Sequence, residues 1–102
     1  VRVVEPLPYF DMLAHLFGTR AVLTDSGGVQ KEAYILEVPC VTLLENTEWV
    51  ETVDDGWNVL VGADTERIVA EAEKAGGGRH SARFGDGHAA ERIAAIITEY
   101  QP

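Results

Sequence analysis

One short run predicts a strand that passes directly into a helix: Ala21-Val22-Leu23-Thr24-Asp25-Ser26-Gly27-Gly28-Val29. Its first four residues are an apolar segment of the buried-strand type, which ends at a polar, glycine-containing turn. From Val29 the apolar period changes, because Val29, Ala33 and Leu36 fall on one helical face until Pro39 prevents the helix from continuing. We therefore expect a strand, a glycine turn and a short helix in close succession.

The same alternation of strands and helices continues on both sides of this run. The expected elements are a strand at Val1–Val4, a helix from Tyr9 to Phe17, a strand from Pro39 to Leu44, a loop or a loop with a helical turn from Glu45 to Gly56, a strand at Asn58–Val61, a helix capped by Asp64, and a last helix that carries Ile93, Ile96, Ile97 and Tyr100. Such alternation predicts an α/β fold with a doubly wound parallel sheet. In such sheets ligands bind outside the carboxyl ends of the strands.

Length and composition predict a single folded domain over residues 1–102, since the hydrophobic share is 46% and the charged share is 25%. Because the sequence begins with Val1 and no methionine, we expect a fragment of a longer protein. The formal net charge of −9 repels polyanions, so nucleic-acid binding is disfavoured.

The single cysteine, Cys40, lies in an apolar run and is expected to be a small core residue rather than a nucleophile. A lone thiol fits a reducing cytoplasm. No apolar stretch approaches the roughly 20 residues that span a bilayer, and no secretory leader is visible, so we expect no membrane association.

The turn at Ser26, Gly27 and Gly28 is the candidate binding site. Glycines at a helix start let an anion approach unpaired backbone N–H groups, and the Ser26 hydroxyl adds a donor, so a phosphate group fits there. Glu32 lies one turn inside the helix, where its carboxylate points back toward the turn and can accept hydrogen bonds from two ribose hydroxyls. Two alternatives remain open: glycines that serve only turn geometry, and a solvated surface Glu32.

The run Thr24-Asp25-Ser26-Gly27-Gly28-Val29-Gln30-Lys31-Glu32-Ala33 resembles the signature of the non-hydrolysing UDP-N-acetylglucosamine 2-epimerases. The resemblance continues through residues 47–53, Gly56, Leu60-Val61-Gly62, Phe84-Gly85-Asp86-Gly87 and Glu91-Arg92-Ile93. It implies a Rossmann-like domain that forms the C-terminal half of a GT-B fold, with the N-terminal domain missing.

The resemblance also implies a division of roles. Ser26, Gly27 and Gly28 would hold the pyrophosphate of a UDP-sugar, and Glu32 would hold the ribose hydroxyls. The family epimerises C2 by eliminating UDP and adding it back, with no hydride cofactor, and its acid and base would lie upstream of this chain. No catalytic residue and no cofactor is therefore expected here. Counting back from Ser26 brings the base-stacking position to Met12, with Phe10 two residues away, and we leave that position open.

One departure from the family pattern concerns the loop that usually reads Thr-Glu-Arg-Pro-Glu. This chain has Thr47-Glu48-Trp49-Val50-Glu51, so the expected cation is absent, and the Thr-Glu-Trp spelling is similar to relatives that act on diacetamido uronic-acid sugar nucleotides. Other possibilities are the donor domain of a GT-B glycosyltransferase and a free-standing nucleotide-binding module.

Two further expectations concern metals and self-association. His15, His80 and His88 lack metal-ligand spacing, so we expect no metal site. An apolar face left uncovered by the missing half would favour a homo-oligomer.

Overall fold

The computed structural model of the chain describes residues 1–78 and 83–100, so His80 lies outside the described residues. Three parallel strands form its sheet: β1 (Val22–Thr24), β2 (Cys40–Thr42) and β3 (Asn58–Leu60), in the order β1-β2-β3. Leu23, Val41 and Val59 are aligned across the three strands. The predicted parallel α/β arrangement is confirmed.

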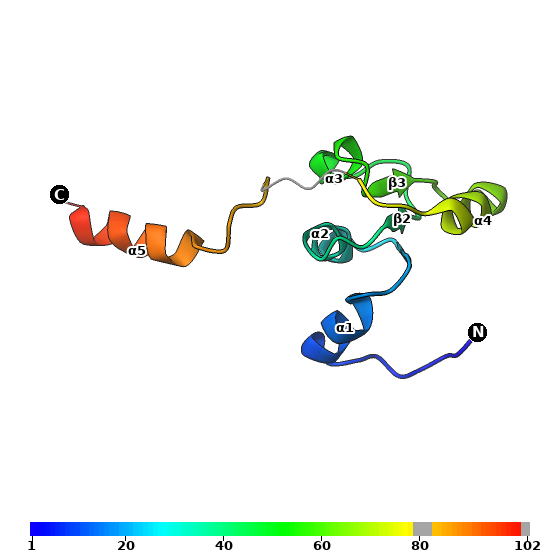
Figure 1. Ribbon diagram of the computed structural model, residues 1–102, viewed down its shortest axis with the longest axis horizontal. Helices are drawn as coiled ribbons and strands as arrows, with labels where there is room; N and C mark the ends of the chain where they lie inside the picture. The colour runs from blue at the N-terminus through cyan, green and yellow to red at the C-terminus, as the bar shows by residue number, and fades with distance from the viewer. Residues whose placement is uncertain (79–82, 101–102) are drawn as a thin grey trace.

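Helices lie on both sides of this sheet. The helices of the described residues are α1 (Tyr9–Leu16), α2 (Gly27–Ile35), α3 (Val50–Asp54), α4 (Thr65–Lys74) and α5 (Ala89–Glu99), of which α5 lies apart from the sheet (Figure 1). The helices α2 and α3 contact each other on one side of the strands, whereas α4 packs against β2 from the other (Figure 1). This is the doubly wound arrangement expected from the alternation of elements. Asp64 caps α4 as predicted, since its carboxylate accepts a hydrogen bond from the Arg67 amide.

The two faces of the sheet differ in chemistry because side chains alternate along a strand. Thr42 and Asn58 point toward α2 and α3 and are buried there. Val41 and Val59 point toward α4, with which they line a small cavity of about 140 Å³. The polar face therefore lies on the side of the candidate turn.

The apolar core lies between α1, α2 and the start of β2. It consists of Leu16, Ala33, Val38 and Cys40, with Val22 and Leu36 packed against it. Cys40 is 3% exposed, which confirms the expected core position, and burial raises the pKa of its thiol.

The prediction of a strand at Val1–Val4 is wrong. These residues are exposed and lie outside the sheet, and residues 1–8 form no regular element. A β-favouring sequence becomes a strand only where a neighbouring strand supplies hydrogen bonds, and within the described residues none lies beside it. The helical turn expected in residues 45–56 is present as α3, and α2 begins at Gly27.

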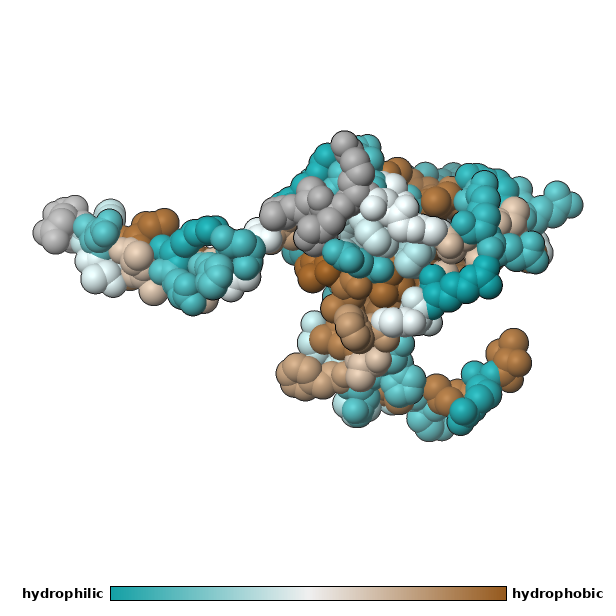
Figure 2. All heavy atoms as spheres, viewed as in Figure 1, coloured by the Kyte–Doolittle hydropathy of each residue, from teal (hydrophilic) through white to brown (hydrophobic). Residues whose placement is uncertain are grey.

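The last helix, α5, lies apart from the sheet (Figure 1). All of its residues are exposed, including Ile93, Ile96 and Ile97, and brown spheres mark hydrophobic residues on α5 and near the N-terminus (Figure 2). In the described part of the chain, no helix is both long enough and apolar enough to cross a bilayer.

Candidate functional site

The start of α2 offers unpaired backbone donors at the carboxyl end of β1. Ser26 is the N-cap residue, and its Oγ accepts a hydrogen bond from the Val29 amide at 3.3 Å. The amides of Gly27 and Gly28 have no hydrogen-bond partner within residues 1–78 and 83–100. Because the helix dipole adds positive potential at this end, the two free amides can bind an anion.

Turn geometry does not require glycine at either position. The glycines with positive φ are Gly18, Gly56, Gly62, Gly85 and Gly87, and neither Gly27 nor Gly28 belongs to this group. A Cβ added to Gly28 would lie 3.6 Å from Glu32 Oε1 and 3.8 Å from Ser26 Oγ, which are ordinary contact distances. Neither the backbone conformation nor the surrounding atoms of the protein therefore require glycine at position 28.

Glu32 points toward this turn, as the direction of helical side chains predicts. The 3.6 Å distance from its Oε1 to the Cβ position of Gly28 places the carboxylate beside the free amides. The side chain is half-buried rather than fully solvated. The structure thus brings Ser26, Gly27, Gly28 and Glu32 together at the carboxyl edge of the sheet.

The loop after β2 covers the other side of the turn. Glu48 Oε1 and Trp49 Nε1 each lie 3.2 Å from the Cβ position of Gly27, so a side chain at Gly27 would displace one of them. Beside this contact lies a cavity of about 310 Å³, within the size range of ligand pockets, which is lined by Gly27, Gln30, Leu44, Asn46, Thr47 and Glu48.

A buried polar network, which the sequence pattern did not predict, fixes that loop. Gln30 Oε1 accepts hydrogen bonds from Thr47 Oγ1 at 2.6 Å and from Asn58 Nδ2 at 3.1 Å. Thr47 Oγ1 also accepts one from the Trp49 amide at 3.0 Å. The one available signal was a glutamine on the inward face of α2, where an apolar residue is the usual choice.

Asn58 is the centre of this network. It accepts a hydrogen bond from Thr42 Oγ1 at 2.6 Å and donates one to Thr52 Oγ1 at 3.0 Å, and Thr52 in turn donates to the Trp49 carbonyl at 2.6 Å. These bonds join β2, β3 and α2 to the loop that carries Trp49. Such a satisfied network holds a loop in one conformation.

An aromatic cluster extends the site toward residues 83–84. The Phe84 ring lies edge-on to Tyr34 and to Trp49, with centroids 5.2 Å and 5.8 Å apart. Lys31 Nζ lies 4.9 Å from the centroid of Trp49 and 5.1 Å from that of Phe84.

Asp55 holds two residues of this region in place, Tyr34 and Arg83. Its buried carboxylate accepts a 2.5 Å hydrogen bond from the Tyr34 hydroxyl and pairs with Arg83 at 3.1 Å.

Two buried polar atoms near the loop have no hydrogen-bond partner among the described residues: Trp49 Nε1 and Glu51 Oε2. An unsatisfied buried donor is uncommon in folded proteins and marks a place where an acceptor is expected. For Trp49 Nε1, that place is beside Gly27.

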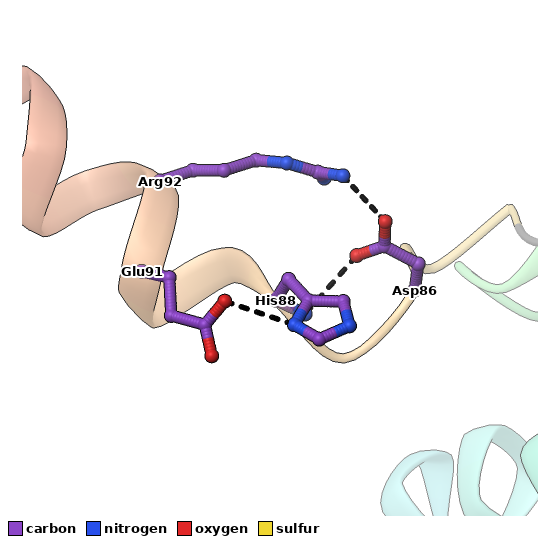
Figure 3. Close-up of polar contacts among 4 residues, drawn as sticks. All are labelled: Asp86, His88, Glu91 and Arg92. Atoms are coloured by element: carbon purple, nitrogen blue, oxygen red, sulfur yellow. Dashed lines mark hydrogen bonds and ion pairs between the residues drawn. The ribbon is translucent and has the colours of Figure 1, made fainter.

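A second polar cluster lies at the start of α5 (Figure 3). The Asp86 carboxylate accepts a hydrogen bond from the His88 amide and pairs with Arg92, while His88 Nδ1 lies 2.9 Å from Glu91 Oε2. All four residues are exposed, and their contacts order the first turn of the helix. The described residues contain no group of three or more side chains able to hold a metal ion.

The candidate positions for base stacking lie on α1. Phe10 is 82% exposed and Met12 is half-buried, and neither lies in the network around Trp49. Their predicted role stays a prediction.

The known proteins to which this chain is similar are UDP-sugar 2-epimerases. The family described as UDP-N-acetylglucosamine 2-epimerase matches residues 1–98. A "UDP-N-acetylglucosamine 2-epimerase homolog" of Methanococcus maripaludis is 46% identical over 95% of this chain and 28% of its own length. The "UDP-2,3-diacetamido-2,3-dideoxy-D-glucuronate 2-epimerase" of Pseudomonas aeruginosa is 44% identical over 97% of this chain and 29% of its own length.

A solved structure supports the same relationship. The UDP-GlcNAc 2-epimerase of Methanocaldococcus jannaschii, in complex with UDP-GlcNAc and UDP, superposes with a TM-score of 0.84 and is 42% identical. The superposition covers 95% of this chain and 27% of that chain. The chain therefore spans a little more than a quarter of the length of the relatives that it matches.

Proposed function

The chain belongs to the UDP-N-acetylglucosamine 2-epimerase family, and from this premise we propose that it is the UDP-binding part of a sugar-nucleotide 2-epimerase. The observation that carries the proposal is the pair of amides at Gly27 and Gly28, which have no acceptor in the described part of the chain, with Glu32 turned toward them. This arrangement matches the two chemical groups of a nucleoside diphosphate that lie side by side, the diphosphate and the ribose diol.

In this proposal each residue binds a defined group. The amides of Gly27 and Gly28 donate to diphosphate oxygens, and the Ser26 hydroxyl, whose oxygen already accepts from Val29, donates its own hydrogen. The Glu32 carboxylate accepts from the ribose hydroxyls. The chain would thus take part in a Rossmann-like C-terminal domain of a GT-B fold, with the other domain supplied by the remainder of the protein.

The chemistry explains why a firm grip on the diphosphate matters. The epimerisation proceeds by elimination of UDP and its addition back, so negative charge grows on the diphosphate as the bond to the sugar breaks. Backbone amides held at the start of a helix stabilise such charge without reorganising. The acid and the base are assigned to the part of the protein that precedes this chain.

A second substrate is favoured by one relative and one residue. The Pseudomonas enzyme, whose name specifies a diacetamido glucuronate sugar, is 44% identical, and this chain carries Trp49 in the loop beside the site. UDP-2,3-diacetamido-2,3-dideoxy-D-glucuronate is therefore the alternative substrate. Family membership favours an epimerase over a GT-B glycosyltransferase, which would require an acceptor.

Two expectations on setting accompany the proposal. A lone buried thiol and a nucleotide-sugar substrate fit the cytoplasm. The exposed apolar residues of α5 are compatible with contact to the rest of the protein or to a second copy.

The test is to incubate the full-length protein with each UDP-sugar in turn, with no acceptor, in heavy water, and to record proton NMR spectra. Appearance of the C2 epimer with deuterium at C2 supports the proposal, and the sugar converted faster identifies the substrate. Release of UDP without an epimer, or conversion only after an acceptor is added, would refute it.

A further inference from the structure

Lys31 carries a positive charge that no carboxylate of the described residues pairs with. Its ammonium lies over the rings of Trp49 and Phe84, at 4.9 Å and 5.1 Å from their centroids. Within residues 1–78 and 83–100 it makes no ion pair and no hydrogen bond. The Lys31 side chain is half-buried. The absence of a carboxylate partner among the described residues is notable because the protein has more than twice as many acidic residues as basic ones.

The Trp49 ring connects this cation to the start of α2. One edge of the indole, at Nε1, lies 3.2 Å from the Cβ position of Gly27, and Lys31 lies over the same ring. Lys31 is four residues after Gly27 on α2, so both residues lie on one side of the helix, and a lysine side chain there extends toward the helix start.

Three sets of donors that have no acceptor among the described residues thus lie near one short stretch of chain: the amides of Gly27 and Gly28, the buried Trp49 indole N–H, and the Lys31 ammonium. All of them favour an anion. The rings of Trp49 and Phe84 attract the Lys31 ammonium through their π faces, but they carry no net negative charge and so do not neutralise it. The carboxylates of Glu32 and Glu48 lie near the glycines but make no bond to Lys31.

We propose that Lys31, held in place by Trp49 and Phe84, binds the diphosphate of the nucleotide together with the Trp49 indole N–H. The inference rests on the proposed function. In this arrangement the Lys31 ammonium recognises the negative charge of the diphosphate, which an uncharged nucleoside lacks. Phe84 is a positioning residue in this arrangement, because it touches the cation and not the ligand.

The experiment compares the affinities for UDP and uridine in the full-length protein, by calorimetry for UDP and by saturation-transfer NMR for uridine. The variants are Lys31→Met, which keeps an unbranched apolar chain one atom shorter and removes the charge, and Lys31→Arg, which keeps the charge. Lys74→Met is the matched control, because Lys74 is an exposed cation on α4, across the sheet, and is already paired with Glu71 at 2.9 Å.

We expect Lys31→Met to weaken UDP binding about tenfold or more while uridine binding stays unchanged. The affinity of Lys31→Arg for UDP should stay within about threefold of the wild-type value. Lys74→Met should bind UDP as the wild-type protein does. The loss in Lys31→Met should also shrink as salt is added, since salt screens the interaction between two charges. Trp49→Phe, which keeps a ring beneath the cation but removes the N–H, should cause a smaller loss specific to UDP.

Other results would overturn the inference. Unchanged UDP affinity in Lys31→Met does so, as does an equal loss for UDP and uridine, which would mean that Lys31 only shapes the site. If Glu32→Gln weakens UDP binding and Lys31→Met does not, the proposed function stands and this inference falls. If wild-type protein binds no UDP, both fall.

Discussion

Replacing Gly28 with alanine separates a binding role of this residue from a structural one. Gly28 is the second residue of α2, its φ is not positive, and an added Cβ would meet only Glu32 Oε1 at 3.6 Å and Ser26 Oγ at 3.8 Å. The free protein should accommodate the methyl group without strain. Alanine also loses less backbone entropy than glycine on entering a helix.

Gly28→Ala is expected to raise the stability of the protein and to lower its affinity for UDP. We expect Gly28→Ala to raise the free energy of unfolding by about 0.5 to 1 kcal/mol, from the helix propensity and the entropy of the unfolded chain. The same methyl group lies where a phosphate would approach the amides, so UDP affinity should fall about tenfold or more, or about 1.4 kcal/mol. A stabilised protein that binds its ligand poorly is a result that simple structural damage does not produce.

The assay pairs thermal or urea unfolding with calorimetric titration of UDP on the same preparation of full-length protein. Gly18→Ala is the matched control, because Gly18 has a φ of +79° and lies after α1. There alanine should lower stability by about 1 kcal/mol and leave UDP affinity unchanged. The reasoning is refuted if Gly28→Ala binds UDP like wild type, or if it is destabilised as much as Gly18→Ala.

Three other perturbations test separate parts of the structure. Glu32→Gln should weaken UDP binding about tenfold and remove any preference for UDP over its 2′-deoxy analogue, which calorimetry with both nucleotides checks; a preserved preference would contradict the ribose assignment. Asn58→Leu removes the bonds to Thr42, Gln30 and Thr52, so unfolding should require about 3 kcal/mol less, at about 1 kcal/mol for each bond, and a urea titration showing no loss would contradict the network's role. Burial raises the pKa of Cys40, so the folded state keeps the thiol protonated where the unfolded chain ionises it; stability should fall as pH rises above about 8.5, and Cys40→Ala should lose that part of the slope in urea titrations from pH 7 to 10.

Local sequence patterns were sufficient to predict most of the fold and the position of the candidate turn at the start of α2. The change of apolar period at Val29 and the proline at residue 39 indicated α2 and β2 because such signals act within one element, although α2 begins at Gly27, two residues before Val29. Glu32 was placed correctly because a helical side chain leans toward the N-terminus whatever its surroundings.

Features that depend on contacts between distant residues were not predictable in this way. The Val1–Val4 segment has the composition of a strand but gains no partner in the sheet, and no local signal reveals that. Gln30 and Asn58 are 28 residues apart, and only the packing of α2 on β3 brings them into hydrogen-bond distance. A sequence does not reveal φ angles, so it cannot tell whether turn geometry requires glycine at positions 27 and 28. The backbone shows that neither residue has a positive φ.

A crystal structure of the full-length protein soaked with UDP tests the central claim most directly. We predict phosphate oxygens within hydrogen-bond distance of the Gly27 and Gly28 amides, and both ribose hydroxyls on the Glu32 carboxylate. Clear density for UDP elsewhere, with those amides still bonded only to water, would contradict the account.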